Sequence, residues 1–221
     1  MKKKKKSDST SSHTLRHGTT GMTRILAVGD LHGDRRLIDG LAKKAKDENV
    51  DLVILAGDLT FAETSTENIV GPFLKAGKEV LIIPGNHESP ATTEFLSKKY
   101  LDTTHLHGNH FIKGNLGIFG AGGADIGVYQ IDDSEILKLL GKSHDKVKSL
   151  DKKLMVTHIH PAGTNSEFSG FKGSKAVRKA IDKFQPDVAV FAHIHEAAGT
   201  EDKIGKTRAI NVSRKGKVFE V

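Results

Sequence analysis

The chain has 221 residues, of which 37% are hydrophobic and 23 are glycine, and its formal net charge is +7. This length suggests one large domain or at most two small ones. There is no cysteine, which excludes disulfides and thiolate metal ligands. No apolar stretch is long enough for a signal peptide or a membrane span, so we expect a cytoplasmic protein without a membrane partner.

Most of the positive charge lies in residues 1–21. This segment holds six basic residues and one acidic residue, so the rest of the chain carries a net charge of only +2. Because it is rich in Ser and Thr and poor in apolar residues, we predict a disordered basic leader over 1–21 and a folded domain over 22–221. The leader either binds RNA or another acidic surface non-specifically, or is an added tail that precedes a natural start at Met22.

From Arg24 onward, short apolar runs alternate with amphipathic stretches, which predicts an α/β fold. In chain order we expect a strand at 25–28, a helix from Asp34 to about Lys46, a strand at 52–55, a helix near 67–76, a strand at 80–83 and a helix at 92–99. Strands with glycine turns follow over 105–120, then a glycine-rich loop at 120–127, a helix at 132–150 and a strand at 154–157. A long loop at 163–173, a helix at 175–184, a strand at 188–191 and short strands over 207–221 complete the prediction.

Polar residues with metal-binding side chains follow five of the apolar runs. They occur in Gly29-Asp30-Leu31-His32-Gly33, in Gly57-Asp58, in Gly85-Asn86-His87-Glu88, at His158, and in His193-Ile194-His195. In α/β sheets, sites gather where the carboxyl ends of strands converge. We therefore expect these segments to meet in one crevice.

These side chains suit a pair of divalent cations. Imidazole and carboxylate bind such ions at about 2.0–2.2 Å, and a carboxylate such as that of Asp58 has two oxygens with which to bridge them. Two ions roughly 3.5–4 Å apart hold a phosphoryl group for in-line displacement. Taken singly, each motif also has an ordinary structural explanation: Asp30 as a cap, Asp58 or Asn86 as a turn residue, and the histidines as surface residues.

The ordered set resembles the calcineurin-like metallophosphoesterases, whose pattern is Asp-x-His, Gly-Asp, Gly-Asn-His-Asp/Glu, a lone His, and Gly-His-x-His. The resemblance implies a four-layer αββα sandwich with two mixed β-sheets and a dinuclear metal centre at its rim. At matching positions it also implies the metal ligands: Asp30, His32 and His195 on one ion, Asn86, His158 and His193 on the other, and Asp58 as the bridge between them. His87 matches the residue that protonates the leaving oxygen, and Glu88 is expected to support the loop that carries His87.

The sequence departs from this family pattern at two informative positions. Ala192 stands where the pattern has glycine before His-x-His, and we expect this methyl group to leave metal binding intact. The segment after Asp58 lacks the arginine of protein Ser/Thr phosphatases, and Phe61 occupies the place of the tyrosine ligand of purple acid phosphatases. Both subfamilies are therefore disfavoured.

The resemblance implies a metal-dependent hydrolase that attacks phosphoesters with a bridging hydroxide. About 200 residues are used by the sandwich, which leaves no large cap domain and favours a phosphodiester substrate. The alternatives are a phosphomonoesterase for small substrates and a non-catalytic binding scaffold on the same fold. We expect two divalent transition metal ions, with Mn²⁺ as the first choice, although the mixture of oxygen and imidazole ligands suits Fe, Ni²⁺ and Zn²⁺ as well. The oligomeric state stays open.

Overall fold

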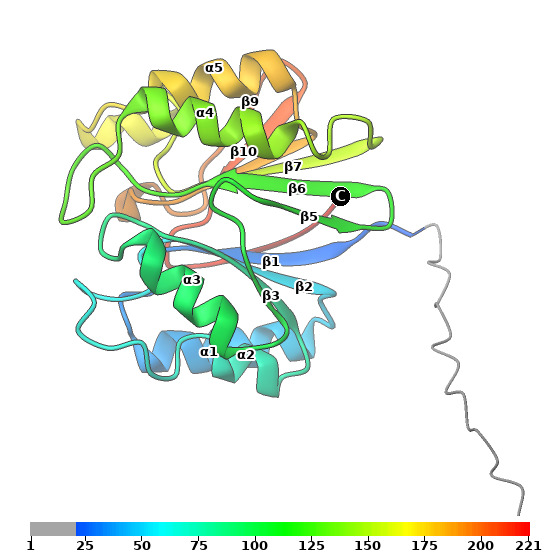
Figure 1. The fold of residues 1–221 in the computed structure, drawn as a ribbon, viewed down its shortest axis with the longest axis vertical. Helices are drawn as coiled ribbons and strands as arrows, with labels where there is room; N and C mark the ends of the chain where they lie inside the picture. Colours follow the sequence, from blue (N-terminus) through cyan, green and yellow to red (C-terminus); the bar gives the residue numbers. More distant parts are fainter. Residues whose placement is uncertain (1–20) are drawn as a thin grey trace, which may run out of the picture.

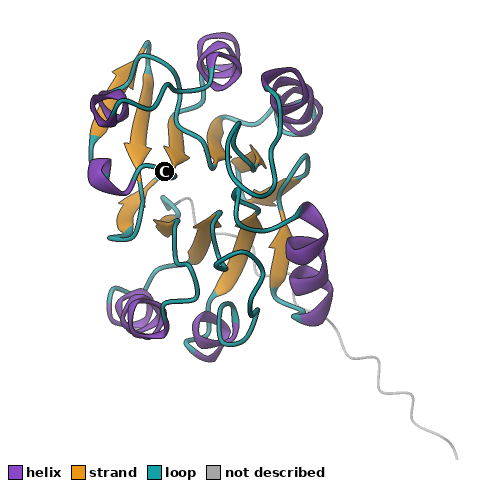
Figure 2. Cartoon of the chain, turned by 90° about the vertical axis from the view of Figure 1, so that its left-hand side faces the viewer, coloured by secondary structure: helices purple, strands orange, loops and turns teal. Residues whose placement is uncertain are grey.

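The computed structural model describes residues 21–221, which fold as four layers (Figures 1 and 2). Two β-sheets lie face to face, and helices cover the outer face of each sheet. The predicted αββα sandwich is thereby confirmed. The leader predicted over 1–21 lies outside the described residues, except for Gly21.

The first sheet carries the first three motifs. Its strand order is β11-β1-β2-β3-β4, in which β1 to β4 run parallel and β11 pairs antiparallel with β1. The bounds are β1 Arg24–Val28, β2 Leu52–Ala56, β3 Glu79–Ile83, β4 Thr103–His105 and β11 Lys217–Glu220. Apart from Arg24 at the start of β1, the strands β1 and β2 consist of apolar residues, as expected for strands that are buried on both faces.

The second sheet carries the histidine motifs. Its order is β5-β6-β7-β8-β10-β9, with four parallel central strands and an antiparallel strand at each edge. The bounds are β5 His110–Lys113, β6 Leu116–Ala121, β7 Lys152–Thr157, β8 Val188–Phe191, β9 Glu201–Ile204 and β10 Thr207–Asn211. The edge strand β9 was not predicted, because its sequence Glu-Asp-Lys-Ile is mostly polar.

Five α-helices form the outer layers. Helices α1 (Arg35–Asp47), α2 (Gly71–Lys75) and α3 (Pro90–Lys99) cover the first sheet, and α4 (Asp133–His144) and α5 (Lys175–Phe184) cover the second (Figure 1). As predicted, the Asp34 side chain caps α1, and it accepts the Leu37 N–H at 3.1 Å. Two 3₁₀ turns, η1 (Asn165–Ser169) and η2 (His195–Ala197), lie in loops near the site.

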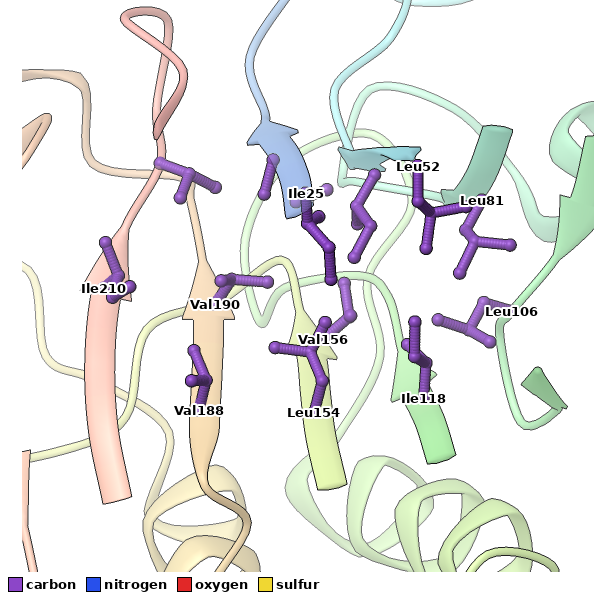
Figure 3. Packing of buried hydrophobic residues seen from close by; sticks show 14 of the residues in the cluster. Ile25, Leu52, Leu81, Leu106, Ile118, Leu154, Val156, Val188, Val190 and Ile210 are labelled. Atoms are coloured by element: carbon purple, nitrogen blue, oxygen red, sulfur yellow. The ribbon is translucent and has the colours of Figure 1, made fainter. Parts of the chain in front are cut away.

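The main core lies between the two sheets. Side chains of the first sheet such as Ile25, Leu52 and Leu81 face Ile118, Leu154 and Val190 of the second (Figure 3). All of them are almost completely buried. This apolar packing fixes the sheets relative to each other, and with them the loops at the strand ends.

Two predicted helices are shorter in the structure. The helix expected over 67–76 is only Gly71–Lys75, because Pro72 restricts the preceding residue and is tolerated only in the first turn. The helix expected over 132–150 ends at His144, and turns then bring Val147 and Leu150 onto Gly117 of β6. A side chain at Gly117 would collide with Val147, so the glycine leaves space for the turn that follows α4 to pack directly on β6.

Candidate metal centre

The predicted site residues follow strand ends of both sheets at the same edge of the sandwich. Asp30 lies two residues after β1, Asp58 two residues after β2 and Asn86 three residues after β3. His158 directly follows β7, and His193 lies two residues after β8. The structure brings together all eight side chains singled out from the sequence: Asp30, His32, Asp58, Asn86, His87, His158, His193 and His195.

Four of these residues have left-handed backbone conformations. The φ angles of Asp30, His32, Asp58 and His193 are 57°, 45°, 51° and 73°. Such a conformation costs a non-glycine residue about 1–3 kcal/mol and persists only where surrounding contacts impose it. Here the N–H of Asp30 donates to Gly57 O at 2.9 Å, and that of His32 donates to Asp58 O at 2.9 Å. The sharp turns aim the side chains into the shared pocket.

Asp30, His32 and His195 form a first donor set. His195 Nε2 lies 3.5 Å from Asp30 Oδ1 and 3.3 Å from His32 Nε2. Asp30 is completely buried, and its other carboxylate oxygen accepts the His193 N–H at 3.2 Å. One carboxylate oxygen and two ring nitrogens therefore converge on one point.

A second donor set lies around His158. Its Nδ1 donates to Ala56 O at 2.9 Å, which leaves Nε2 directed at Asn86 Oδ1 (3.0 Å) and Asp58 Oδ1 (3.4 Å). The ring centroid of His193 lies 5.1 Å from that of His158, and the donor atoms of Asp58, His158 and His193 lie within 4.8 Å of one another. This arrangement requires glycine at position 57, where φ is 86° and a Cβ would lie 2.5 Å from His158 Nδ1.

Asp58 lies between the two sets. Its Oδ1 faces His158, whereas its Oδ2 lies 3.7 Å from His32 Nε2 and 3.9 Å from His87 Nε2. The backbone N–H of His87 donates to Asp58 Oδ1 at 2.9 Å, which orients the carboxylate. The two oxygens of one buried side chain are thus divided between neighbouring donor sets.

The donor atoms fit metal ions. Atoms about 2.1 Å from a common ion are separated by roughly 3.0–3.4 Å at octahedral or tetrahedral angles. The separations of His158 from Asn86 and Asp58, 3.0 and 3.4 Å, and of His32 from His195, 3.3 Å, lie in this range. Asp30 Oδ1 is buried and has no hydrogen-bond donor. Within residues 21–221, histidines alone form ion pairs with Asp30 and Asp58. Since two buried carboxylates need compensating charge, divalent cations suit this pocket.

The histidine pKa values reflect the same electrostatics. Burial on its own lowers the pKa of His158, but the charges of Asp58 and Asp30 outweigh it and raise the pKa to about 9. Burial and the charge on His158 together lower the pKa of His193 to about 3. The oxygens around His158 therefore favour a proton or a metal ion at its Nε2, and metal binding would displace that proton.

Glu88 supports the site through hydrogen bonds to two of its loops. This buried carboxylate accepts the N–H groups of Leu59 (3.1 Å), Thr60 (3.1 Å) and Gly85 (2.8 Å) and the Thr60 hydroxyl (3.2 Å). Burial, together with the charge of Asp58, raises the pKa of Glu88, while the three N–H donors oppose this shift. Glu88 thereby connects the loop after β2 to the loop after β3, a supporting role that the resemblance had implied.

Sequence reasoning missed a contribution from the C-terminal segment. Arg214 Nη1 donates to Asp30 O (3.3 Å) and its Nη2 donates to Asp34 Oδ2 (3.0 Å), so Arg214 braces the first motif. No local pattern marks this residue, because it follows β10 and meets the motif only in the folded chain. The Ala192 side chain fits against Gly29: its Cβ lies 2.4 Å from where a Cβ on Gly29 would be, and glycine has none.

Comparison with protein families matches residues 23–197 to the calcineurin-like phosphoesterases. The chain belongs to this family. Membership and the His/Asp clusters support a metal-dependent phosphoester hydrolase with a dinuclear divalent metal site. No match appears among curated protein sequences, and no helix in the described residues has the length and apolar character needed to cross a membrane.

Several solved structures show the same fold at low sequence identity. TT1561 of Thermus thermophilus superposes with a TM-score of 0.73 at 17% identity, covering 90% of this chain and 99% of that one. A dimetal phosphatase from Danio rerio gives a TM-score of 0.59 at 12% identity, covering 86% of each chain. An archaeal phosphodiesterase gives 0.54 at 14% identity, covering 90% of this chain and 100% of that one.

Proposed function

We propose that this protein hydrolyses phosphodiesters at a dinuclear metal centre. The observation that carries the proposal is the overlap of the donor clusters, in which His32 and Asp58 each belong to two of the three groups. Overlapping clusters suit two adjacent ions better than two isolated sites. The ligands would be Asp30, His32 and His195 on one ion, Asn86, His158 and His193 on the other, and Asp58 between them.

The two ions would polarise the phosphoryl oxygens and supply an activated water as nucleophile. Mn²⁺ is our first candidate because carboxylate and amide oxygens suit it, and Fe, Ni²⁺ and Zn²⁺ are the alternatives because imidazole suits them. Asp58 would hold both ions, and the hydrogen bond from His158 Nδ1 to Ala56 O keeps that ring turned toward Asn86 and Asp58.

His87 is our candidate for the group that protonates the leaving oxygen. Its Nε2 lies 3.9 Å from Asp58 Oδ2, and its partly exposed ring lies at the edge of the donor sets rather than beneath them. A bound phosphoester would therefore meet His87 from the solvent side. General-acid catalysis of this kind contributes about 10²–10⁴-fold to the rate.

A diester is favoured because the site edge is open. In residues 21–221 the connections beside the metal centre are loops and 3₁₀ turns, and none forms a domain over it. A substrate with two ester groups needs space on both sides of the phosphate, which such an edge provides. A small phosphomonoester is the alternative substrate.

The test is hydrolysis of bis-p-nitrophenyl phosphate and p-nitrophenyl phosphate by protein loaded with Mn²⁺. We expect two equivalents of metal per chain, faster turnover of the diester, loss of turnover in Asp58→Ala and a roughly 10²–10⁴-fold decrease in His87→Ala. His110→Ala, which alters a histidine of β5 that belongs to none of the donor groups, is the matched control and should retain activity. Metal-loaded protein that turns over neither ester would contradict the proposal and favour a binding scaffold.

A further inference from the structure

Exposed apolar side chains gather on the loops around the metal centre. Of the nine large hydrophobic side chains exposed in residues 21–221, five lie on loops that follow β2, β6 and β7 at the site edge. We call these five residues the apolar rim: Phe61, Ile126, Val128, Phe168 and Phe171. Apolar groups clustered at a surface commonly mark a binding site.

Phe61 lies against the proposed catalytic histidine. Its ring centroid is 5.2 Å from that of His87, with an interplanar angle of 33°, and 6.1 Å from that of His32. The side chain is nevertheless 60% exposed. An aromatic surface is therefore presented to solvent directly beside the position where a leaving group would meet His87.

The loop that carries Phe61 is held rigidly. The next two residues, Ala62 and Glu63, both have left-handed conformations, with φ of 49° and 57°. The Glu63 carboxylate accepts the Ser89 N–H at 2.8 Å and the Tyr129 hydroxyl at 2.6 Å. Although burial opposes it, these and neighbouring hydrogen bonds lower the pKa of Glu63 to about 2, so the anchor stays ionised at neutral pH.

The same anchor also holds the segment that carries Val128. Tyr129, which donates to Glu63, follows Val128, and the N–H groups of both residues donate to Asn86 O at 3.0 and 3.1 Å. Val128 is 61% exposed. The exposed side chains of Phe61 and Val128 are thus both held next to the Asn86–His87 dipeptide. A preorganised aromatic surface loses little entropy when a flat ligand stacks on it.

We propose that Phe61 is a specificity-determining contact that stacks on a planar, apolar group attached to the phosphate, either an aryl group or a nucleobase, with Val128 adding apolar contact. This inference rests on the proposed function, because it assumes that a phosphate binds at the metal centre. Removing an aromatic side chain from under a stacked base weakens binding by roughly 5- to 100-fold. A substrate group without a flat face would gain little from Phe61.

The test compares ligands that differ only in the planar group. Calorimetry on Mn²⁺-loaded protein measures the Kd of phenylphosphonate and methylphosphonate, which contain no hydrolysable ester. Inhibition of bis-p-nitrophenyl phosphate hydrolysis, in initial rates, measures the Ki of adenosine 5′-monophosphate and ribose 5-phosphate. We expect the planar member of at least one pair to bind more tightly, and the pair that shows the preference identifies the group as aryl or nucleobase.

Phe61→Ala should remove this preference by weakening the planar ligand roughly 5- to 100-fold, while its partner changes less than about twofold. Phe95→Ala, which removes an equally exposed phenylalanine (52%) from α3, is the matched control and should leave both pairs unchanged. No preference in the wild type, or an equal loss for both members of a pair, would overturn the inference while hydrolysis continues. Absence of hydrolysis would refute the proposed function instead, and the phosphonate pair would still test Phe61.

Discussion

Replacement of Glu88 by Gln tests how the two site loops are joined. The new amide has one oxygen and one NH₂ group, whereas all four partners of Glu88 donate hydrogen bonds in the structure. If the amide oxygen faces Leu59 and Gly85, only the Thr60 N–H meets an NH₂ group, since the Thr60 hydroxyl can rotate to accept. The opposite orientation would leave two buried N–H groups unpaired, so the first should prevail.

The expected loss of stability follows from the single N–H group that is left unpaired. A buried donor left unpaired costs about 1–3 kcal/mol, so Glu88→Gln should lower the free energy of unfolding by that amount. In the Glu88→Gln background, Thr60→Ala should cost more than in the wild type, because it also removes the acceptor for the new NH₂ group. Urea unfolding of the four proteins in this cycle measures both effects. Unchanged stability of Glu88→Gln would refute the reasoning, because it would mean that Glu88 is already neutral and donates a proton of its own.

Three further changes test the site and its surroundings. Gly85→Ala would place a Cβ 2.0 Å from Asp58 Oδ1, so it should lower the free energy of unfolding by about 1–3 kcal/mol and reduce the bound metal measured by elemental analysis. Gly77→Ala is the control, because its added Cβ meets open space and should leave the metal content unchanged. Burial lowers the pKa of His107 to about 4 from 6.5, so its contribution to stability is complete above pH 6.5 and is lost as the pH falls toward 4. His107→Asn keeps an acceptor for the Gly122 N–H, and its free energy of unfolding in urea should decrease less than that of the wild type between about pH 7.5 and 5. An identical pH dependence in the two proteins would count against this assignment. Chelation should lower the melting temperature, since a ligand at about 100 times its Kd stabilises by about 2.7 kcal/mol, and added Mn²⁺ should restore it; a melting temperature insensitive to chelator would argue against bound metal.

The strands and the gathering of the site could be predicted because the signal is local. Each site strand is a short apolar run followed within one to three residues by a candidate ligand, as Val28 is followed by Gly29 and Asp30, and parallel strand ends meet at one edge. The supporting contacts could not be predicted in this way. Arg214 and Tyr129 reach the site region from distant parts of the chain, and neither occurs in a recognisable motif.

Helix lengths were predicted less well than helix positions. The periodicity from residue 67 to 76 continues across Pro72, but the proline fixes where the helix can begin. The strand β9 escaped prediction because an edge strand needs little apolar character when its outer side faces water.

The pairing of β11 with β1 has a consequence for how the protein folds. The strand that precedes the first candidate motif is joined on one side by the last strand of the chain, through Arg24–Glu220 and the neighbouring pairs. This contact of very high sequence separation makes closure of the sheet an intrinsically late and slow event. During synthesis, one edge of the apolar strand β1 stays unpaired until residues almost 200 positions later have been added. Until then, this edge can pair with a strand of a neighbouring nascent chain.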